Sequence, residues 1–474
     1  MTETVYVKRI VESKNIENAE ILLKKRDLAI GIYEENFAKV SEKGGYIVLD
    51  FGKEMCGGIR IFTAAVPTPT KTVNVRLRFG ESLSEVYAEI GEKNATNHHA
   101  PRDFVYPISL LSDLKIGDTG YRFVRIDFEA CPGKVTLKSI VGTNTMLKMP
   151  LKYAYKGEDK RIGEIFRAAK RTVDLCSGSG WVWDGIKRDR LVWIGDLYPE
   201  ILSLTAMYGR VKAIERSLDF ERRRPRYNGK WSCSISSYSM WWMACLCEYY
   251  FRTGAKEFLL SQLDYIEELI ALFNAHVDEN GDMHYPNYFV DWPTKGTEDD
   301  YVGVRSINIF AAKKAQRLYR ELGKDTSALD HLLEKLMRGD MTVKTMKQVV
   351  GLKYYALGEI SDRDYALLTE GGARGLSTFM SYFILGAIAS RDPELAVTVM
   401  KEYYGAMLDK GATTFFEDFD MDWVEGSSRI DELPKEGEKD IHGDFGKHCY
   451  LGFRHSLCHA WSSGVIEFIK EYCE

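Results

Sequence analysis

The stretch RIGEIFRAAKRTVDLC, residues 161–176, is where the spacing of apolar side chains changes along the chain. Ile162, Ile165, Phe166, Ala169 and Val173 recur at intervals of three and four, which places them on one stripe of a helix. The same spacing returns downstream in residues 197–208, 240–252, 257–277, 302–322, 327–337, 376–389, 393–408 and 456–472. Residues 151–474 are therefore predicted to form a helical domain.

This helical part shows neither a coiled-coil heptad nor a repeat of fixed period, which favours one closed bundle over an open solenoid. At about 26 residues for each helix with its connection, it would hold roughly twelve helices. Such a number suits six antiparallel hairpins closed into an (α/α)6 barrel, also called a six-hairpin toroid. Gly254, Gly323 and Gly411 lie where helices should end.

Residues 1–150 have the spacing of β-strands instead. In TVNVRLRFG, residues 72–80, the apolar side chains fall on every second position, so one face of the strand is buried and the other faces water. Runs at 46–51, 59–65, 121–128 and 134–141 are similar, and turn signals such as Gly44-Gly45 and Pro132-Gly133 separate them. An N-terminal β-sandwich is the predicted fold of this part.

Length, charge and cysteine spacing argue against several classes of protein. The 474 residues exceed what one core usually serves, and the net charge of −5 argues against nucleic acid as a partner.

No run approaches the roughly 18 apolar residues of a membrane span, and the N-terminus lacks a signal pattern, so we expect a cytoplasmic protein. The nine cysteines lack CxxC spacing, which favours reduced thiols over disulfides or zinc. We expect no metal and no cofactor, and whether the chain forms a homo-oligomer stays open.

The segment WVWDGIKRDRLVWIGD, residues 181–196, combines three carboxylates, three tryptophans and three cations. Aromatic faces stack on the C–H surfaces of sugars, and carboxylates accept hydroxyl hydrogen bonds or perform acid–base work. The alternative is structural: Asp184 and Arg188, four residues apart, would form an ion pair on a helix surface, and the tryptophans would belong to the core.

A second acidic segment, GATTFFEDFDMDW, occupies residues 411–423 between two predicted helices. Acidic residues mixed with aromatic ones suggest a loop over a pocket. A calcium loop is the competing interpretation, but Asp418-Asp420-Asp422 lacks the glycine and the terminal glutamate of an EF-hand. Tyr238, Asp291-Trp292 and residues 455–461, HSLCHAW, are further candidates, each of which could instead be scaffold.

These segments resemble those of a known family. DGIKRDRLVWIGD, residues 184–196, resembles the signature D-x-P-x-R-[DE]-x-R-L-x-W-x-G-D of bacterial α-L-rhamnosidases of glycoside hydrolase family 78, or its version shorter by one residue. Residues 411–414, an aromatic residue and Glu417 are similar to the later catalytic loop, and residues 456–459 resemble its S-x-N/C-H motif. Residues 49–54, 78–83 and 123–126 resemble strands of the sandwich before the (α/α)6 barrel, so the resemblance spans residues 45–465.

The resemblance implies an inverting hydrolase of terminal α-L-rhamnosides, with Asp189 as general acid and Glu417 as general base. Inversion requires the two carboxyl groups to stand roughly 6.5–9.5 Å apart with water between them. The predicted substrate-binding residues are Asp184, Arg188, Trp193, Asp196, Tyr238, Trp292 and His459. The expected partner is a small glycoside, without nucleic acid or membrane.

The sequence also departs from the family pattern. Asp189 stands where the shorter signature usually has Glu, Ile186 replaces the common Pro, and Phe416 stands where Trp often precedes the base. Two alternatives therefore remain. One is a six-hairpin hydrolase or lyase acting on another sugar or uronide, in which Arg188 and Tyr238 could serve a lyase site. The other is a non-catalytic carbohydrate-binding relative.

Overall fold

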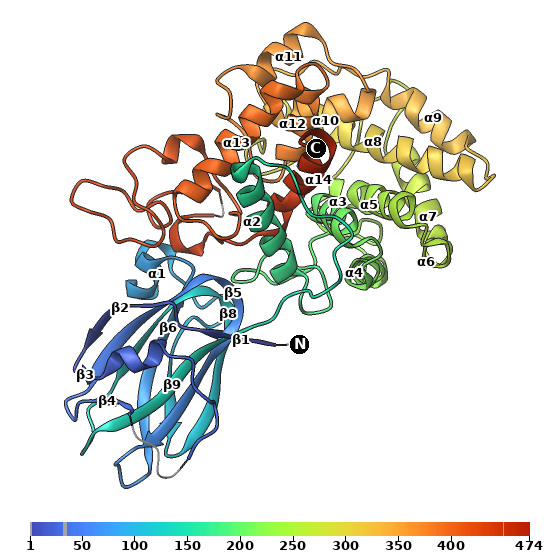
Figure 1. The fold of residues 1–474 in the computed structure, drawn as a ribbon. Helices are drawn as coiled ribbons and strands as arrows, with labels where there is room; N and C mark the ends of the chain where they lie inside the picture. Colours follow the sequence, from blue (N-terminus) through green and yellow to red (C-terminus); the bar gives the residue numbers. More distant parts are fainter. Residues whose placement is uncertain (1, 32–35, 449) are drawn as a thin grey trace.

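The computed structural model describes residues 2–31, 36–448 and 450–474, and it consists of a β domain followed by a helical domain (Figure 1). The strands are β1 (Glu3–Tyr6), β2 (Arg9–Lys14), β3 (Ile16–Glu17), β4 (Ala38–Val40), β5 (Gly45–Ala65), β6 (Thr72–Gly80), β7 (Asp103–Ser109), β8 (Ser112–Phe128) and β9 (Val135–Asn144). Short helical turns lie among them at η1 (Ala19–Leu23), α1 (Leu83–Tyr87) and η2 (Glu92–Asn94).

The strands form one hydrogen-bonded antiparallel sheet that curls on itself, whereas the sequence predicts a sandwich of two sheets (Figure 1). Its order is β3-β4-β9-β5-β8-β6-β7, with β1 on β9 and β2 on β5. The register of β5 against β8 shifts between Asp50 and Met55 and again between Gly57 and Ile59. Bulges of this kind bend a strand. The long strand β5 therefore bends along its length, and the sheet curls without dividing into two separate sheets.

The helical domain begins after a connection that contains the predicted boundary at residue 150. Its helices are α2 (Lys160–Cys176), α3 (Leu197–Tyr208), α4 (Lys212–Arg223), α5 (Ser237–Thr253), α6 (Lys256–Leu260), α7 (Leu263–Ala275), α8 (Asp300–Glu321), α9 (Ser327–Leu336), α10 (Lys347–Leu357), α11 (Asp362–Thr369), α12 (Ser381–Ala389), α13 (Pro393–Asp409) and α14 (Val465–Tyr472). Three 3₁₀ turns are η3 (Met421–Trp423), η4 (Gly452–Arg454) and η5 (Ala460–Gly464).

Six of these helices pack in a ring. α3 contacts α5, α5 contacts α8, α8 contacts α10, α10 contacts α12, α12 contacts α14, and α14 returns to α3. Every residue of α3 and of α12 is buried, as expected of helices with neighbours on all sides. α4 and α9, by contrast, bury one face and expose the other, so they lie outside the ring.

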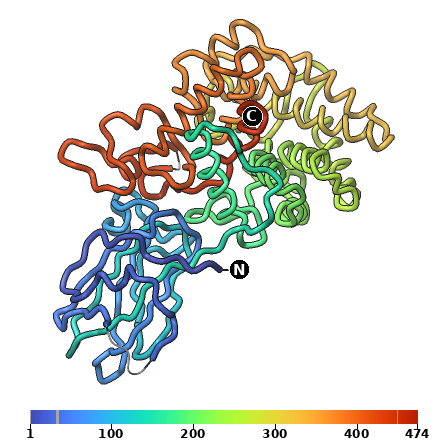
Figure 2. Tube along the Cα trace, in the orientation of Figure 1, coloured from blue at the N-terminus to red at the C-terminus, as the bar shows by residue number. Residues whose placement is uncertain are grey.

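The chain after α13 forms long loops that lie between the helical ring and the β domain (Figure 2). Leu83 of α1 donates its N–H to the carbonyl of Ile430 at 2.7 Å, and Arg122 of β8 donates to the carbonyl of Gly411 at 3.2 Å. In the described residues no helix combines the length and apolar character that a membrane crossing needs. The cysteines of that part are free thiols, and Cys449 lies outside it.

Candidate active site

A pocket at the end of the helical ring encloses about 430 Å³ of space free of protein atoms, part of it open to solvent. Its wall consists of Asp184, Arg188, Asp189, Trp193, Asp196, Ile235, Tyr238, Phe289, Trp292, Glu417, Tyr450, His459 and Trp461. All nine residues predicted from the sequence for the site are among them, although they come from segments more than 200 residues apart. The structure therefore brings the predicted residues together, and their individual roles stay predictions.

The first segment forms a closed loop, residues 184–191, which we call the acid loop. Asp184 donates its N–H to the Leu191 carbonyl at 3.0 Å, and the Leu191 N–H donates to Asp184 Oδ1 at 2.9 Å. Asp189 and Arg190 have φ angles of 60° and 54°, a left-handed conformation that costs a non-glycine residue roughly 1–2 kcal/mol. The alternative of a helix-surface pair between Asp184 and Arg188 is wrong, because the segment is not helical.

Arg188 connects the two proposed catalytic carboxyl groups. Its Nη2 contacts Glu417 Oε1, its Nε lies 3.4 Å from Glu417 Oε2, and its Nη1 lies 3.3 Å from Asp189 Oδ1. Burial opposes the charge of Arg188, but the Glu417 carboxylate outweighs this and raises the pKa of the guanidinium. The Arg188 guanidinium thus holds both carboxyl groups at the same pocket. Two of the hydrogen bonds named above go to Glu417 and one goes to Asp189.

Glu417 is held by the segment that precedes α14. The Ser456 N–H donates to Glu417 Oε2 at 3.0 Å, and His459 Nε2 lies 3.6 Å from Oε1. Its own N–H donates to the Ser456 carbonyl at 3.0 Å, and its carbonyl accepts from Trp461 Nε1 at 3.0 Å. These contacts on the side chain and the backbone hold the Glu417 carboxyl group in one orientation toward a ligand.

The calcium-loop interpretation of the segment after Glu417 finds no support in the described residues. Asp420 caps η3 by accepting the Asp422 N–H at 3.0 Å, and Asp422 forms an ion pair with Arg374. Burial, with the neighbouring Glu417 and Asp420 carboxylates, raises the pKa of Asp418 to about 7. The three aspartates do not gather around a common point in that part of the chain.

Asp184 and Asp196 form the polar floor of the pocket. Burial, followed by the charges of neighbouring carboxylates, raises the pKa of both side chains well above their usual range. Tyr238 donates its hydroxyl to Asp196 Oδ1 at 3.3 Å. Burial lowers the pKa of His459 well below its usual range, so this imidazole is neutral. Neutral carboxyl groups both donate and accept, which suits them to bind sugar hydroxyls.

The side walls are aromatic. Trp193 and Tyr238 meet edge to face with ring centres 6.1 Å apart, and Trp292 meets Tyr450 in the same way at 5.9 Å. His459 lies over Trp461 with the ring centres 4.1 Å apart. Four further residues line the pocket and were not predicted from the sequence: Ile235, Phe289, Tyr450 and Trp461. The first three carry no chemical signature in the sequence, whereas Trp461 belongs to the candidate segment HSLCHAW.

A buried cluster joins the acid loop to the β domain. The Lys187 ammonium lies 3.0 Å from Glu81 and 3.2 Å from Glu85, and it donates to the His455 carbonyl at 2.6 Å. Glu81 in turn accepts the Leu457 N–H at 2.6 Å. Burial raises the pKa of Glu81 to about 7, while Lys187 opposes that rise. The β domain therefore helps to place both segments that carry the pocket.

We expect Lys187→Met to destabilise the protein by about 3–5 kcal/mol, because it leaves two buried carboxyl groups without their cation. Urea unfolding followed by circular dichroism measures this loss. The exposed Lys230→Met is the matched control and should change stability by less than about 0.5 kcal/mol. Equal stability of the two variants would show that the cluster does not hold the domains together.

Comparison with known proteins gives a clear answer for the fold. No protein-family model matches the sequence, and a search of curated proteins finds no match. Among solved structures, a rhamnosidase from Klebsiella oxytoca with rhamnose bound matches with a TM-score of 0.75 at 18% identity, over 100% of this chain and 96% of that one.

Two longer structures also match. A GH78 family rhamnosidase of Bacillus sp. GL1 has a TM-score of 0.68 at 18% identity, over 93% of this chain and 47% of that one. The α-L-rhamnosidase of Streptomyces avermitilis, complexed with L-rhamnose, has a TM-score of 0.67 at 16% identity, over 90% and 42%. This chain spans about half the length of these two. It has the fold of the α-L-rhamnosidases.

Proposed function

We propose that this chain is a glycoside hydrolase that cleaves terminal α-L-rhamnosides with inversion, using Asp189 as acid and Glu417 as base. The observation that carries the proposal is the pocket in which Arg188 contacts both carboxyl groups between aromatic walls. The fold is that of structures with rhamnose bound, which supports the choice of sugar. A pocket of this size suits one terminal sugar ring and a small glycoside.

The reaction needs one proton donor and one acceptor. Asp189 donates a proton to the glycosidic oxygen as its bond to the anomeric carbon breaks. Glu417 removes a proton from a water molecule as that water forms a bond to the opposite face of the same carbon. The Arg188 guanidinium pairs with Glu417 and orients it, and the neutral Asp184 and Asp196 bind sugar hydroxyls.

We also propose that the helical domain, residues 151–474, is an (α/α)6 toroid and that residues 1–150 are the β domain. The ring of α3, α5, α8, α10, α12 and α14 supports this, because each of these helices follows a helix that lies outside the ring in chain order. An alternation of outer and inner helices is what six antiparallel hairpins produce.

The lyase alternative is weakened by the contacts of its two candidate residues. A lyase would need a cation to neutralise a uronate, whereas Arg188 pairs with Glu417 and Asp189. It would also need a tyrosine or histidine base, whereas the Tyr238 hydroxyl donates to Asp196, and burial raises the pKa of Tyr238 well above its usual range.

Asp184→Asn tests which aspartate is the acid. Since burial keeps Asp184 protonated, the neutral amide is a close substitute, and we expect kcat/KM on an aryl α-L-rhamnoside to fall by no more than roughly 10-fold, the value of one hydrogen bond. Steady-state kinetics on the purified variant measures it. A loss as large as that expected for Asp189→Asn would transfer the role of acid to Asp184.

A further inference from the structure

A histidine of the β domain reaches the proposed general acid. His99 Nε2 lies 3.0 Å from Asp189 Oδ1, and the two side chains are 20% and 13% exposed. His99 belongs to the segment between α1 and β7, residues 88–102, which we call the His99 loop. His99 was not predicted as a site residue, because nothing in the sequence around it indicates a contact with an acid 90 residues further along the chain.

The other contacts of Asp189 determine what His99 can do. Arg188 Nη1 lies 3.3 Å from Oδ1, and Trp193 Nε1 donates to Oδ2 at 3.2 Å. A guanidinium and an indole can donate hydrogen bonds but cannot accept them, whereas an imidazole nitrogen can do either. Of the three side chains that the structure places on Asp189, His99 is therefore the one that can accept a proton from it. Because His99 Nε2 faces Oδ1, this is the oxygen that carries the shared proton, and it also accepts from Arg188.

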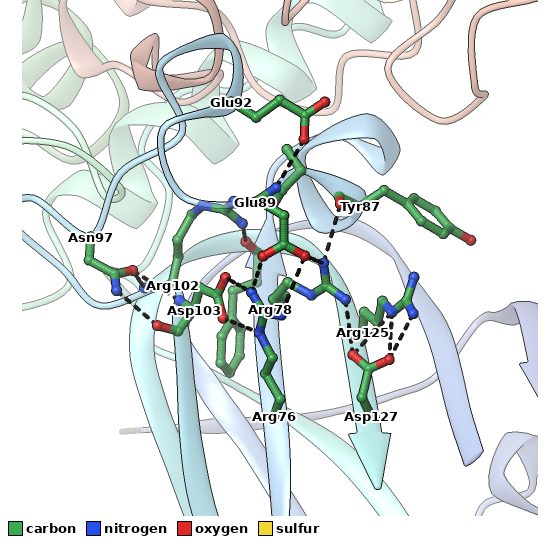
Figure 3. Close-up of polar contacts among 12 residues, drawn as sticks. Arg76, Arg78, Tyr87, Glu89, Glu92, Asn97, Arg102, Asp103, Arg125 and Asp127 are labelled. Carbon is green, nitrogen blue, oxygen red and sulfur yellow. Dashed lines mark hydrogen bonds and ion pairs between the residues drawn. The ribbon is translucent and has the colours of Figure 1, made fainter. Parts of the chain in front are cut away.

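The His99 loop is anchored at its end near β7 (Figure 3). Arg102 is buried and donates to three backbone carbonyl groups at 2.8–3.2 Å. Asn97 Oδ1 accepts the N–H groups of Arg102 and Asp103 at 2.9 Å and 3.0 Å, and its amide donates back to the Asp103 carbonyl at 2.8 Å. These bonds fix the backbone on both sides of His99.

The start of the loop is held by charge (Figure 3). Glu89 forms ion pairs with Arg76 and with Arg78 of β6, and Arg78 Nη1 lies 3.1 Å from Glu89 Oε1. Between the two anchors, Ala95 packs against Phe453 of η4, which belongs to the helical domain. His99 thus sits on a loop that is tied to the sheet at both ends and packed against the helical domain in between. A position fixed in this way is typical of a residue that orients another group.

We propose that His99 is a positioning residue that accepts the Oδ1–H of Asp189 and so keeps the acid protonated until a glycosidic oxygen takes the proton. The inference rests on the proposed function and deepens it. No covalent change occurs at His99: the proton stays on Asp189 in the resting enzyme and passes to the leaving oxygen in the reaction.

The surroundings of His99 agree with a neutral imidazole. Its pKa is lowered first by burial, and the neighbouring His98, Arg188 and Arg454 lower it further, while Asp189 raises it. Three of the charged or titratable groups that face His99 therefore oppose its protonation, and one carboxyl group, that of Asp189, favours it. An imidazole that stays neutral presents a nitrogen lone pair to a neighbouring O–H group.

The test compares two leaving groups over a range of pH. An alkyl glycoside such as methyl α-L-rhamnoside needs protonation of its leaving oxygen, whereas a nitrophenyl α-L-rhamnoside needs little. We expect His99→Ala to lower kcat/KM on the methyl glycoside by roughly 10–100-fold at neutral pH, part of the 10²–10⁴-fold that acid catalysis supplies. On the nitrophenyl glycoside the loss should stay below roughly threefold. The alkaline limb of the pH profile should move to lower pH, because the acid loses the acceptor of its proton.

Two further variants separate this role from a structural one. His99→Gln supplies an amide oxygen that can accept the O–H, so it should recover much of the alkaline limb. His331→Ala is the matched control, since His331 is an exposed histidine of α9 that belongs neither to the pocket nor to the His99 loop. His331→Ala should behave as the wild type on both glycosides.

The outcomes distinguish the inference from the function on which it rests. An alkaline limb that moves to higher pH in His99→Ala would make His99 a donor to an ionised Asp189 and overturn the inference. Equal losses on the two glycosides, or no loss on either, would also overturn it while leaving the hydrolase intact. A wild-type enzyme that cleaves neither glycoside would remove the proposed function and the inference together.

Discussion

We expect Glu417→Gln to lower kcat on an α-L-rhamnoside by roughly 10²–10⁴-fold, the contribution of one acid–base partner. Glu417 is 1% exposed, and Arg188 and the Ser456 N–H hold its carboxylate in place. An amide of the same shape keeps one accepting oxygen but cannot take a proton from water. Turnover of a nitrophenyl glycoside, which needs little help from the acid, isolates this loss because the base is required whatever the leaving group.

The control for this variant is Glu425→Gln, an exposed glutamate eight residues further along the chain. It should keep wild-type turnover. Thermal unfolding of both variants verifies that Glu417→Gln is folded, because it leaves the Arg188 guanidinium without its main partner. A folded Glu417→Gln enzyme with wild-type kcat would remove Glu417 from the role of base.

Asp189→Asn has an effect that depends on the leaving group. On methyl α-L-rhamnoside we expect kcat/KM to fall by roughly 10²–10⁴-fold, because the amide cannot protonate the departing oxygen. On a nitrophenyl glycoside the loss should be much smaller, and the alkaline limb of the pH profile should disappear with the group that produces it. Steady-state kinetics with both glycosides over a range of pH measures this.

Inversion proceeds without a covalent glycosyl-enzyme intermediate, so rescue of activity by azide or another small nucleophile is not part of this test. The comparison is with Asp184→Asn, which changes a neighbouring buried aspartate of the same loop and should cost far less. Large and equal losses on both glycosides in Asp189→Asn would indicate that the residue shapes the pocket without donating a proton.

Most of the fold follows from the period of the apolar residues. The predicted helix at 197–208 coincides with α3, which ends where Gly209 takes a φ of 73°. The predicted helix at 257–277 is instead divided into α6 and α7, because the chain turns at Ser261 and Gln262 while the apolar spacing continues across the turn. Periodicity reports which face is buried and is insensitive to such a change of direction.

Other elements carried too little signal. α4, α10 and α11 were not predicted, since α4 is dense in charged residues and α11 has eight residues. The predicted helix at 376–389 starts at Ser381, and the one at 456–472 becomes η5 followed by α14. Alternation in the β domain predicts strands with one buried face, but it does not say whether they form two sheets or one curled sheet.

The site was predictable where chemistry is concentrated in short segments. The nine assigned residues share one pocket. Hydrogen bonds join the segment from His455 to Trp461 both to Glu417 and to the acid loop, which brings these three segments together. Tyr450, Ile235 and Phe289 line the same pocket with side chains that serve equally well in a core. His99 reaches the pocket from the other domain, and such a contact exists only after the chain has folded.

The proposed function requires this chain to hydrolyse α-L-rhamnosides with inversion. Proton NMR of the sugar released from an α-L-rhamnoside in the first minutes of reaction, before mutarotation, tests it directly. An inverting enzyme releases β-L-rhamnose as the first-formed anomer, and the α anomer appears later. First release of the α anomer, or the absence of any hydrolysis by folded protein, would contradict it.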